Sequence, residues 1–230
     1  SSYLFVDDII NQSPTGAPSP GWPASWGANV VDYGIDPAVI NLEGATAVKN
    51  ALKAIPTLNI TTDLANLFDP SVGIYANAYA EGRDWERPAS LELLQPDGSA
   101  GFQVNAGLRV RGGYSRSGDN PKHSFRLFFR GEYGDSSLDY PIAGPNATDA
   151  FEKIDLRTAQ NYSWSFEGNP SNNFVADVYN RLSQQAMGQP STSSQWYHLY
   201  LNGEYWGLYQ TQERSEADFA ASYFGGSSSD

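Results

Sequence analysis

The chain of 230 residues contains no cysteine and only two histidines, His123 and His198. The lack of cysteine excludes disulfides, thiolate metal sites and cysteine nucleophiles. Two histidines argue against a multi-histidine metal site. The composition does not exclude a site in which carboxylates bind a hard cation.

Positive charge is also scarce. The chain has 14 Lys and Arg against 26 Asp and Glu, which gives a net charge of −12. Such a protein repels nucleic acid and anionic membrane surfaces, unless its basic residues are focused into one cleft. No run of residues is apolar for long enough to span a bilayer, and no signal peptide is visible. We therefore expect neither a nucleic-acid partner nor a membrane span.

The composition suits an extracytoplasmic bacterial protein. Lysine is rare, Asp, Gly, Tyr and Trp are frequent, and four Asn-X-Ser/Thr sequences occur. The first residue is Ser1, without an initiating methionine, which is typical of a processed or excised product. We expect the protein to be secreted or held at the cell surface.

Apolar residues make up 40% of the chain and aromatic residues 13%, which is enough for a folded core without covalent cross-links. Residues 11–37 are rich in Pro, Gly and Ser but carry Trp22 and Trp26, so we expect an ordered surface wrap. We divide the chain into residues 1–54, a wrap with a short strand at residues 1–10 and a helix; residues 55–226, the main domain; and residues 227–230, a polar tail.

The main domain is predicted to contain seven strands, a long helix after the fifth strand and a last helix at its end. Period-two alternation and turn signals predict strands at residues 57–61, 89–94, 101–111, 124–130, 153–157, 196–201 and 205–210. The clearest helix is at residues 172–187, where an apolar stripe runs through Phe174, Val175, Val178, Leu182 and Met187. A last helix begins near residue 215. These elements predict an α+β fold, an antiparallel sheet with one long helix packed on it.

Basic residues are concentrated in one short part of this acidic chain. Six of the fourteen cations lie between residues 109 and 130: Arg109, Arg111, Arg116, Lys122, Arg126 and Arg130. They flank a glycine-rich loop at residues 112–122, whose backbone N–H groups can approach an anion closely. The pattern has two interpretations. It is a phosphate-binding arrangement, or it is a solvated edge strand whose cations prevent pairing with other sheets.

Four stretches of the sequence carry a resemblance to a known family. They are residues 107–116 (GLRVRGGYSR), residues 121–127 (PKHSFRL), residues 151–157 (FEKIDLR) and residues 201–213 (LNGEYWGLYQTQE). In this order they resemble the CotH kinase family, first known from spore-coat proteins. Residues 73–87 (GIYANAYAEGRDWER) are similar to the entry segment of large CotH-domain proteins.

The resemblance covers residues 55–226 and implies the N-terminal half of the CotH domain, a protein-kinase-like N-lobe with its hinge. The resemblance assigns nine residues to nucleotide binding, and they lie on the glycine-rich loop and the strands beside it, on the long helix and at the hinge. They are Arg111, Gly112, Gly113, Ser115, Lys122, Arg126, Asp177, Gln212 and Glu213. Lys122 or Arg126 takes the role of the strand cation that holds the phosphates.

Several of these residues also have a plainer interpretation. Asp177 is either the acid that pairs with the strand cation or an ordinary first-turn residue favoured by the helix dipole. Glu213 lies either near the hinge or simply on the surface. Arg157 reaches Asp177 or a phosphate. His123, beside a lysine on a loop, is weak as a catalytic candidate.

The resemblance implies ATP and Mg²⁺ as ligands and a protein Ser/Thr substrate outside the cytoplasm. It also implies that no catalytic residue lies in this chain, because the catalytic and metal-binding carboxylates belong to a second lobe. We expect the chain to be a fragment that is inactive until a second chain or segment supplies that lobe. The alternative is a non-catalytic module for surface assembly or carbohydrate binding. It predicts an exposed Trp22 or Trp26, and it could use Tyr205, Trp206 and Tyr209 as a stacking platform. Alternation along the strand instead places Trp206 and Leu208 in the core, which favours packing.

Overall fold

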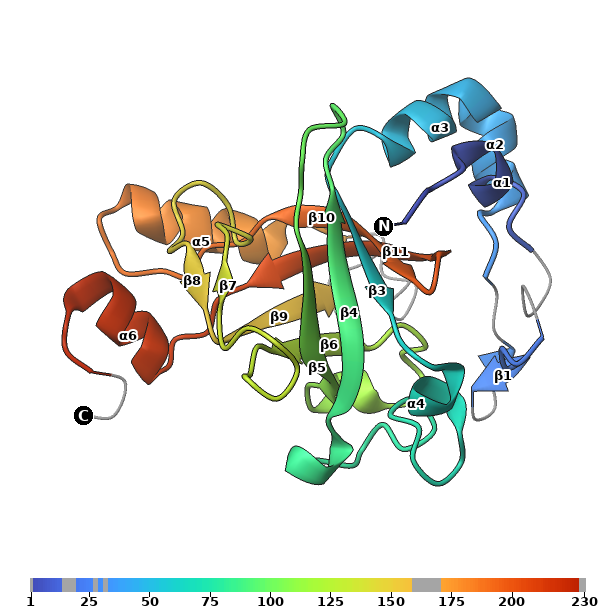
Figure 1. Cartoon of the computed structure of the whole chain (residues 1–230). Coiled ribbons are helices and arrows are strands. Elements are labelled where there is room, and N and C mark those ends of the chain that lie inside the picture. The colour runs from blue at the N-terminus through green and yellow to red at the C-terminus, as the bar shows by residue number, and fades with distance from the viewer. Residues whose placement is uncertain (1, 14–19, 27–28, 31–32, 159–170, 228–230) are drawn as a thin grey trace.

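The computed structural model describes residues 2–13, 20–26, 29–30, 33–158 and 171–227 (Figure 1). Its N-terminal part contains α1 (Val6–Ile9), β1 (Ser25–Trp26), β2 (Asn29–Val30), α2 (Pro37–Glu43) and α3 (Ala45–Leu52). The central part contains β3 (Thr57–Thr61), α4 (Leu64–Phe68), η1 (Arg83–Trp85), β4 (Arg87–Leu94), β5 (Gln103–Arg111), η2 (Tyr114–Arg116), β6 (Ser124–Phe128), β7 (Leu138–Asp139) and β8 (Ala150–Phe151). The C-terminal part contains β9 (Lys153–Thr158), α5 (Ala176–Ala186), β10 (Trp196–Leu201), β11 (Glu204–Gln212) and α6 (Ala217–Phe224).

The main sheet closes into a barrel with the strand order β10-β11-β9-β6-β5-β4-β3. Its neighbouring strands are antiparallel, except that β10 runs parallel to β3, with Leu199 opposite Leu58. The prediction of an open antiparallel sheet with one long packed helix, like a kinase N-lobe, is therefore wrong. The strands themselves lie close to where alternation placed them. The closing pair joins segments far apart in sequence, and no local pattern marks that pairing.

The barrel interior is filled by the apolar side of each strand. Fully buried side chains on several strands share this inner side, among them Leu58, Ile60, Leu91, Leu108, Phe125, Leu127, Leu156 and Leu199. Because side chains alternate across a strand, the residues between them point outward. The outer side of the strands is therefore where polar side chains are displayed.

A bulge in β11 brings two large aromatic residues into the interior. The register between β10 and β11 shifts between Leu199 and Tyr200, next to Gly207, which has φ +136°. Strict alternation places Trp206 and Leu208 on one side. Instead Trp206 and Tyr209 are both buried, at 1% exposure, while Leu208 is half-buried. Glycine permits this backbone conformation, which residues with a Cβ rarely adopt.

The N-terminal segment covers one end and one side of the barrel. Trp22 and Tyr33 pack on Trp206, with ring centroids 5.8 Å away in each case. Residues 1–10, where we expected a short strand, contain the helix α1, whose Ile9 packs with Leu52 and Tyr200 outside the barrel. In Figure 1, α1, α2 and α3 lie together beside the upper end of β3.

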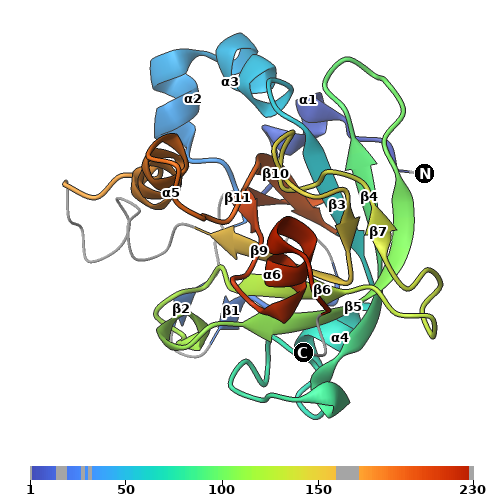
Figure 2. The same ribbon diagram turned by 90° about the vertical axis from the view of Figure 1, so that its left-hand side faces the viewer.

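Helix α5 does not bury the whole apolar stripe that we predicted, since Phe174 and Val178 of that stripe are only half-buried. Three residues of its apolar stripe are exposed, namely Val175, Leu182 and Met187, and its buried side chain is Arg181. The helix lies outside the barrel on the side of β11 and β9, while α6 lies in front of β9 and β6 in the view of Figure 2. The polar face of α5 therefore meets the polar outer side of the barrel.

This orientation gives a direct stability prediction. Replacing Leu182 by glutamine is expected to change the free energy of unfolding by no more than about 0.5 kcal/mol, because the side chain is 55% exposed. Replacing the fully buried Leu199 by alanine is expected to lower it by about 2–5 kcal/mol. Urea denaturation of both variants measures the difference, and a loss of several kcal/mol in Leu182→Gln would contradict the placement of α5.

Candidate functional site

A row of polar side chains crosses the outer side of four barrel strands. The strand registers pair Arg109 with Arg126, Arg126 with Asp155, and Asp155 with Gln212. Arg109, Arg126 and Asp155 alternate with buried apolar neighbours, and Gln212 lies directly opposite Asp155, so all four project from the same side of the sheet. Residues from β5, β6, β9 and β11 that are distant in sequence are brought together in this way.

Asp155 is the buried anchor of this row. Its Oδ1 and Oδ2 accept from Nε and Nη2 of Arg126 at 2.6 and 3.2 Å, and Nε of Arg111 lies 3.2 Å from Oδ2. Asp155 is 1% exposed, so the two guanidinium groups replace its lost hydration. One carboxylate thus orients two arginines, which leaves one positive charge uncompensated at this point.

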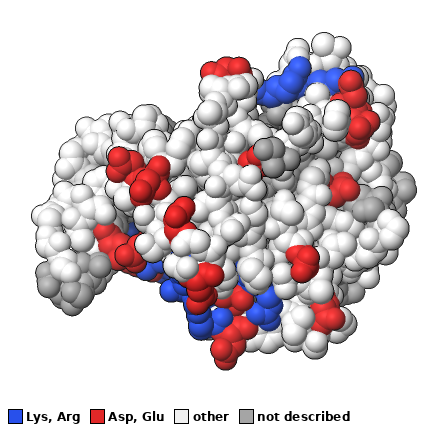
Figure 3. All heavy atoms as spheres, in the orientation of Figure 1, with Lys and Arg blue, Asp and Glu red and all other residues white. Residues whose placement is uncertain are grey.

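An open groove of about 450 Å³ lies beside this row. Its basic lining residues come from β5, η2, β6, β9 and the segment after β11, and they are Arg109, Arg111, Arg116, Arg126, Lys153 and Arg214. Gly112 and Gly113 also line it, and Glu81 is the one acidic residue among the lining residues. In a chain of net charge −12, six of fourteen cations therefore face one hollow. Figure 3 shows Lys and Arg along the lower edge of the molecule, with acidic residues among them, and a second basic group over α3.

Burial and neighbouring positive charges lower the pKa of two guanidinium groups in the groove. Burial lowers the pKa of Arg111, Asp155 partly offsets this, and the neighbouring Arg126 and Arg157 lower the pKa further. Burial likewise lowers the pKa of Arg109. Burial and nearby like charge both disfavour the charged form. An anion in the groove would offset the repulsion between these neighbouring guanidinium groups.

The glycine-rich loop is fixed by a buried arginine. Arg116 Nε donates to the carbonyl oxygen of Gly112 at 2.6 Å, and its Nη1 donates to those of Ala78 and Ala80 at 2.8 and 3.0 Å. Gly112 has φ +115°, and a Cβ there would lie 1.8 Å from Ser115 Oγ. A side chain at position 112 is therefore excluded by both backbone strain and contact. The loop is a defined turn at the rim of the groove.

Lys122 and Arg126, the two residues that we considered for holding the phosphates, lie in different places in the structure. Arg126 lines the groove, whereas the Lys122 ammonium lies 3.7 Å from the ring centroid of Trp206, at the end of the barrel. His123 follows Lys122 away from the groove, and its Nδ1 is 2.9 Å from the carbonyl oxygen of Ser115. Burial lowers the pKa of His123, which favours the neutral ring.

Asp177 belongs to a second polar cluster, under α5. Its Oδ2 accepts from Arg181 at 2.8 Å and from Arg157 and Gln210 at 3.4 Å each, so the cations that pair with it are Arg181 and Arg157 rather than Lys122 or Arg126. Arg157 Nη1 also donates to Gln212 Oε1 at 2.6 Å. This cluster attaches the helix to β9 and β11. Arg111, Gly112, Gly113 and Arg126 thus lie at the groove, and Asp177 and Gln212 lie beside it.

Glu213 has a structural environment of its own. It is 5% exposed, and its two carboxylate oxygens accept from the Ser193 N–H and the Tyr223 hydroxyl, each at 2.7 Å. The interpretation as a plain surface residue does not describe this position. The contact with Tyr223 ties α6 to the end of β11, next to Arg214 in the groove.

Sequence reasoning missed three residues of the site. Asp155 lies on a predicted strand, and alternation in residues 153–157 puts it on the same side as Lys153 and Arg157, so a signal for it existed. Lys153 and Arg214 enter the groove only because β6 pairs with β9 and because α6 follows β11 closely. No spacing along the chain marks either of them.

The groove does not fit a resident divalent metal ion. The one buried carboxylate in its polar row, Asp155, is already shared by Arg111 and Arg126. Among the described residues, no group of three His, Cys, Asp or Glu side chains is placed to hold a metal ion. The donors that line the groove are guanidinium, ammonium and backbone N–H groups, which bind anions.

Two comparisons with known proteins bear on the family of this chain. A family model described as CotH kinase protein matches residues 108–229, which is more than half of the sequence. Comparison with curated proteins gave no match. In the part of the chain that the structure describes, no helix has the length and apolar character needed to cross a membrane.

Proposed function

We propose, from the premise that the chain belongs to the CotH kinase protein family, that its basic groove holds the phosphates of ATP. In this proposal the chain is the nucleotide-binding part of a phosphotransferase that acts on Ser or Thr of extracytoplasmic or surface proteins. Carboxylates supplied by a second segment or a partner chain carry the metal ion and the acceptor. The chain alone binds nucleotide and transfers no phosphate.

The observation that carries the proposal is the gathering of six cations at one hollow of an acidic protein. Arg111 and Arg126 are oriented by a buried carboxylate, so their remaining donors are preorganised. The turn at Gly112 and Gly113 brings backbone close to the same hollow. Planar guanidinium groups and close backbone suit a polyphosphate, which presents several anionic oxygens in a row.

The alternative of a carbohydrate-binding surface finds less support. Trp22, one of the two tryptophans of which that function exposes at least one, is 8% exposed and packs against Trp206. Trp206 and Tyr209 are buried inside the barrel and offer no stacking platform. The side chain of Trp26 lies outside the described residues.

Calorimetric titration with ATP, with and without Mg²⁺, tests the proposal on the 230-residue chain. The wild type is expected to bind ATP. Arg111→Gln is expected to weaken binding about tenfold or more, since a hydrogen bond to a charged group contributes about 1.5–3 kcal/mol. Asp155 keeps its two contacts with Arg126 in this variant, so the fold is preserved.

Lys53→Gln is the matched control, because it removes one positive charge from an exposed position at the end of α3. ATP affinity is expected to stay within about twofold in this variant, since surface charges at a distance are largely screened by salt. Absence of ATP binding to the wild type, or an equal loss in both variants, would overturn the proposal.

A further inference from the structure

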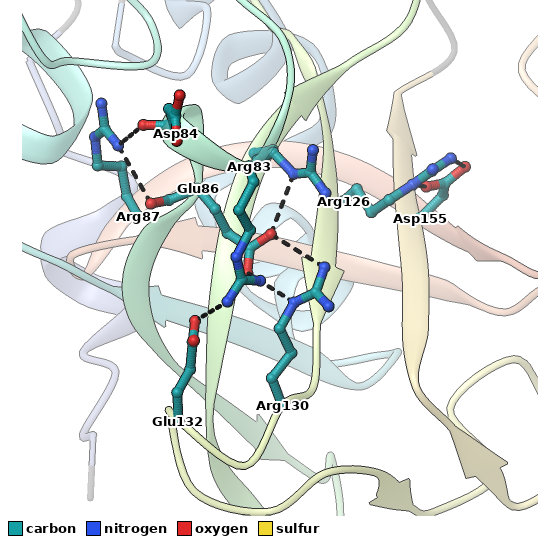
Figure 4. A network of polar contacts seen from close by, with 9 residues as sticks. Arg83, Asp84, Glu86, Arg87, Arg126, Arg130, Glu132 and Asp155 are labelled. Carbon is teal, nitrogen blue, oxygen red and sulfur yellow. Dashed lines mark hydrogen bonds and ion pairs between the residues drawn. The ribbon is translucent and has the colours of Figure 1, made fainter.

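A second group of arginines surrounds a buried glutamate next to the groove. Glu86 follows η1, and its carboxylate is 1% exposed. Arg83 Nη1 donates to Glu86 Oε1 at 2.7 Å, Arg130 Nε donates to the same oxygen at 3.0 Å, and Arg109 Nε lies 3.3 Å from Oε2. Figure 4 shows Arg83 and Arg130 converging on Glu86 from two different segments. We call Arg83, Arg109, Arg130 and Glu86 the Glu86 cluster.

Two residues of the barrel strands, Gly107 and Phe128, pack directly against the cluster. Gly107 leaves room for the glutamate, because a Cβ at that position would lie 2.3 Å from Glu86 Oε1. The Phe128 ring supports two of the arginines, with guanidinium carbons 3.8 Å (Arg109) and 4.8 Å (Arg130) from its centroid. Stacking on an aromatic ring fixes the plane of a guanidinium group and leaves its edge donors available.

The cluster carries more positive charge than one glutamate requires. Three guanidinium groups face the Glu86 carboxylate, and among the residues that the structure describes the only other carboxylate bound to them is that of Glu132. Glu132 is on the exposed turn after β6, with its side chain 51% exposed, and it accepts from Arg83 Nη2. Without Glu132 the cluster has a surplus of two positive charges.

Some donors of the cluster are also unused. Within the described part of the chain, neither terminal nitrogen of Arg109 nor Nη1 of Arg130 donates a hydrogen bond to a protein group. Arg109 Nε is buried without good hydrogen-bond geometry. Neutralising Glu86 needs a single arginine, so a purely structural role leaves the other two unexplained. Three guanidinium groups fixed by one carboxylate are instead suited to receiving a second anion.

We propose that the Glu86 cluster binds a phosphate monoester dianion, carried by a phosphorylated side chain of the protein substrate. A dianion matches the surplus of two charges, whereas a carboxylate matches half of it. Glu132 then acts as an internal competitor that a dianion displaces from Arg83. The assignment to the protein substrate rests on the proposed function, while phosphate binding by the cluster does not. Because Arg109 and Phe128 also line the groove, a phosphorylated residue bound here lies next to the nucleotide site.

Fluorescence anisotropy with labelled peptides tests this proposal on the 230-residue chain. The probe is a short Gly/Ser peptide with one phosphoserine, compared with the same peptide carrying Ser or Glu at that position, and inorganic phosphate serves as competitor. The phosphopeptide is expected to bind about tenfold more tightly than the Glu peptide, as two charges are more strongly attracted than one.

Two variants move the affinity in opposite directions. Arg130→Gln is expected to weaken phosphopeptide binding about tenfold, and Arg83 and Arg109 still neutralise Glu86. Glu132→Gln, on an exposed turn, is expected to tighten binding several-fold because it removes the competing carboxylate. Lys53→Gln is the control for net charge. Equal affinity for phosphorylated and unphosphorylated peptides, or no change in these two variants, would overturn the proposal.

The same variants separate this inference from the proposed function. Arg130→Gln is expected to weaken ATP binding clearly less than Arg111→Gln does, because Arg130 does not line the groove. Equal losses for ATP and phosphopeptide would show a single site and refute the separate cluster. Phosphopeptide binding without any ATP binding would support the cluster and reject the nucleotide proposal. Displacement of the peptide by inorganic phosphate identifies the phosphate group as the bound part.

Discussion

Replacing Asp155 by alanine is expected to lower the free energy of unfolding by about 3–5 kcal/mol, the cost of breaking a buried ion pair by removing one partner. Asp155 is 1% exposed and holds both Arg126 and Arg111. Without it, two guanidinium groups on adjacent barrel strands face each other with no carboxylate between them. Urea denaturation followed by circular dichroism measures the change.

Asp135→Ala is the matched control, because Asp135 is exposed on the turn after β6. Its effect is expected to stay within about 0.5 kcal/mol. A loss below about 1 kcal/mol in Asp155→Ala would contradict the view that this carboxylate organises the outer side of the barrel. Asp155→Asn keeps the shape and removes the charge, so the difference between the wild type and this variant isolates the ionic part.

Replacing Trp206 by alanine is the other change with a large expected effect. The side chain is 1% exposed, its Nε1 donates to the Tyr75 hydroxyl at 2.9 Å, and it contacts both Trp22 and Tyr33. Truncating a buried tryptophan costs about 3–5 kcal/mol, because contacts are lost and a cavity remains. The same change removes the ring beneath Lys122.

The variant also tests how the N-terminal segment is attached. Loss of the Trp22 and Tyr33 contacts is expected to make residues 20–35 more susceptible to limited proteolysis. Trp206→Phe retains an aromatic ring and is expected to lose clearly less stability. If Trp206→Ala unfolds at the wild-type urea concentration, the packing of the N-terminal segment on the barrel end is contradicted.

Sequence periodicity predicted the strands but could not predict the barrel. Alternation located β3, β4, β5, β6, β9, β10 and β11 because each has one buried apolar side. Closure depends on the parallel pair of β3 and β10, and such a pairing leaves no mark in either strand. The CotH resemblance was correct as to family, while the kinase-like sheet that it implied was not the fold observed.

The orientation of α5 shows why an apolar stripe can mislead. A stripe indicates a buried face only when the surface opposite is apolar. Here the outer side of β9 and β11 presents Arg157 and Gln210, so Asp177 and Arg181 face the barrel. Leu182 remains outside as a consequence. The candidate site was predictable where cations are dense in sequence, at Arg109, Arg111 and Arg126, and unpredictable where pairing alone supplies them, at Lys153 and Arg214.

Chemical-shift mapping with ¹⁵N-labelled protein and ATP tests the central claim most directly. The account predicts the largest shifts at the backbone amides of Gly112 and Gly113 and at the side-chain Nε–H groups of Arg111 and Arg126. Unlabelled AMP, with a single phosphate, is expected to cause smaller shifts at the same positions. Shifts confined to residues remote from the groove, or none at saturating ATP, would contradict the claim that this basic hollow holds a polyphosphate.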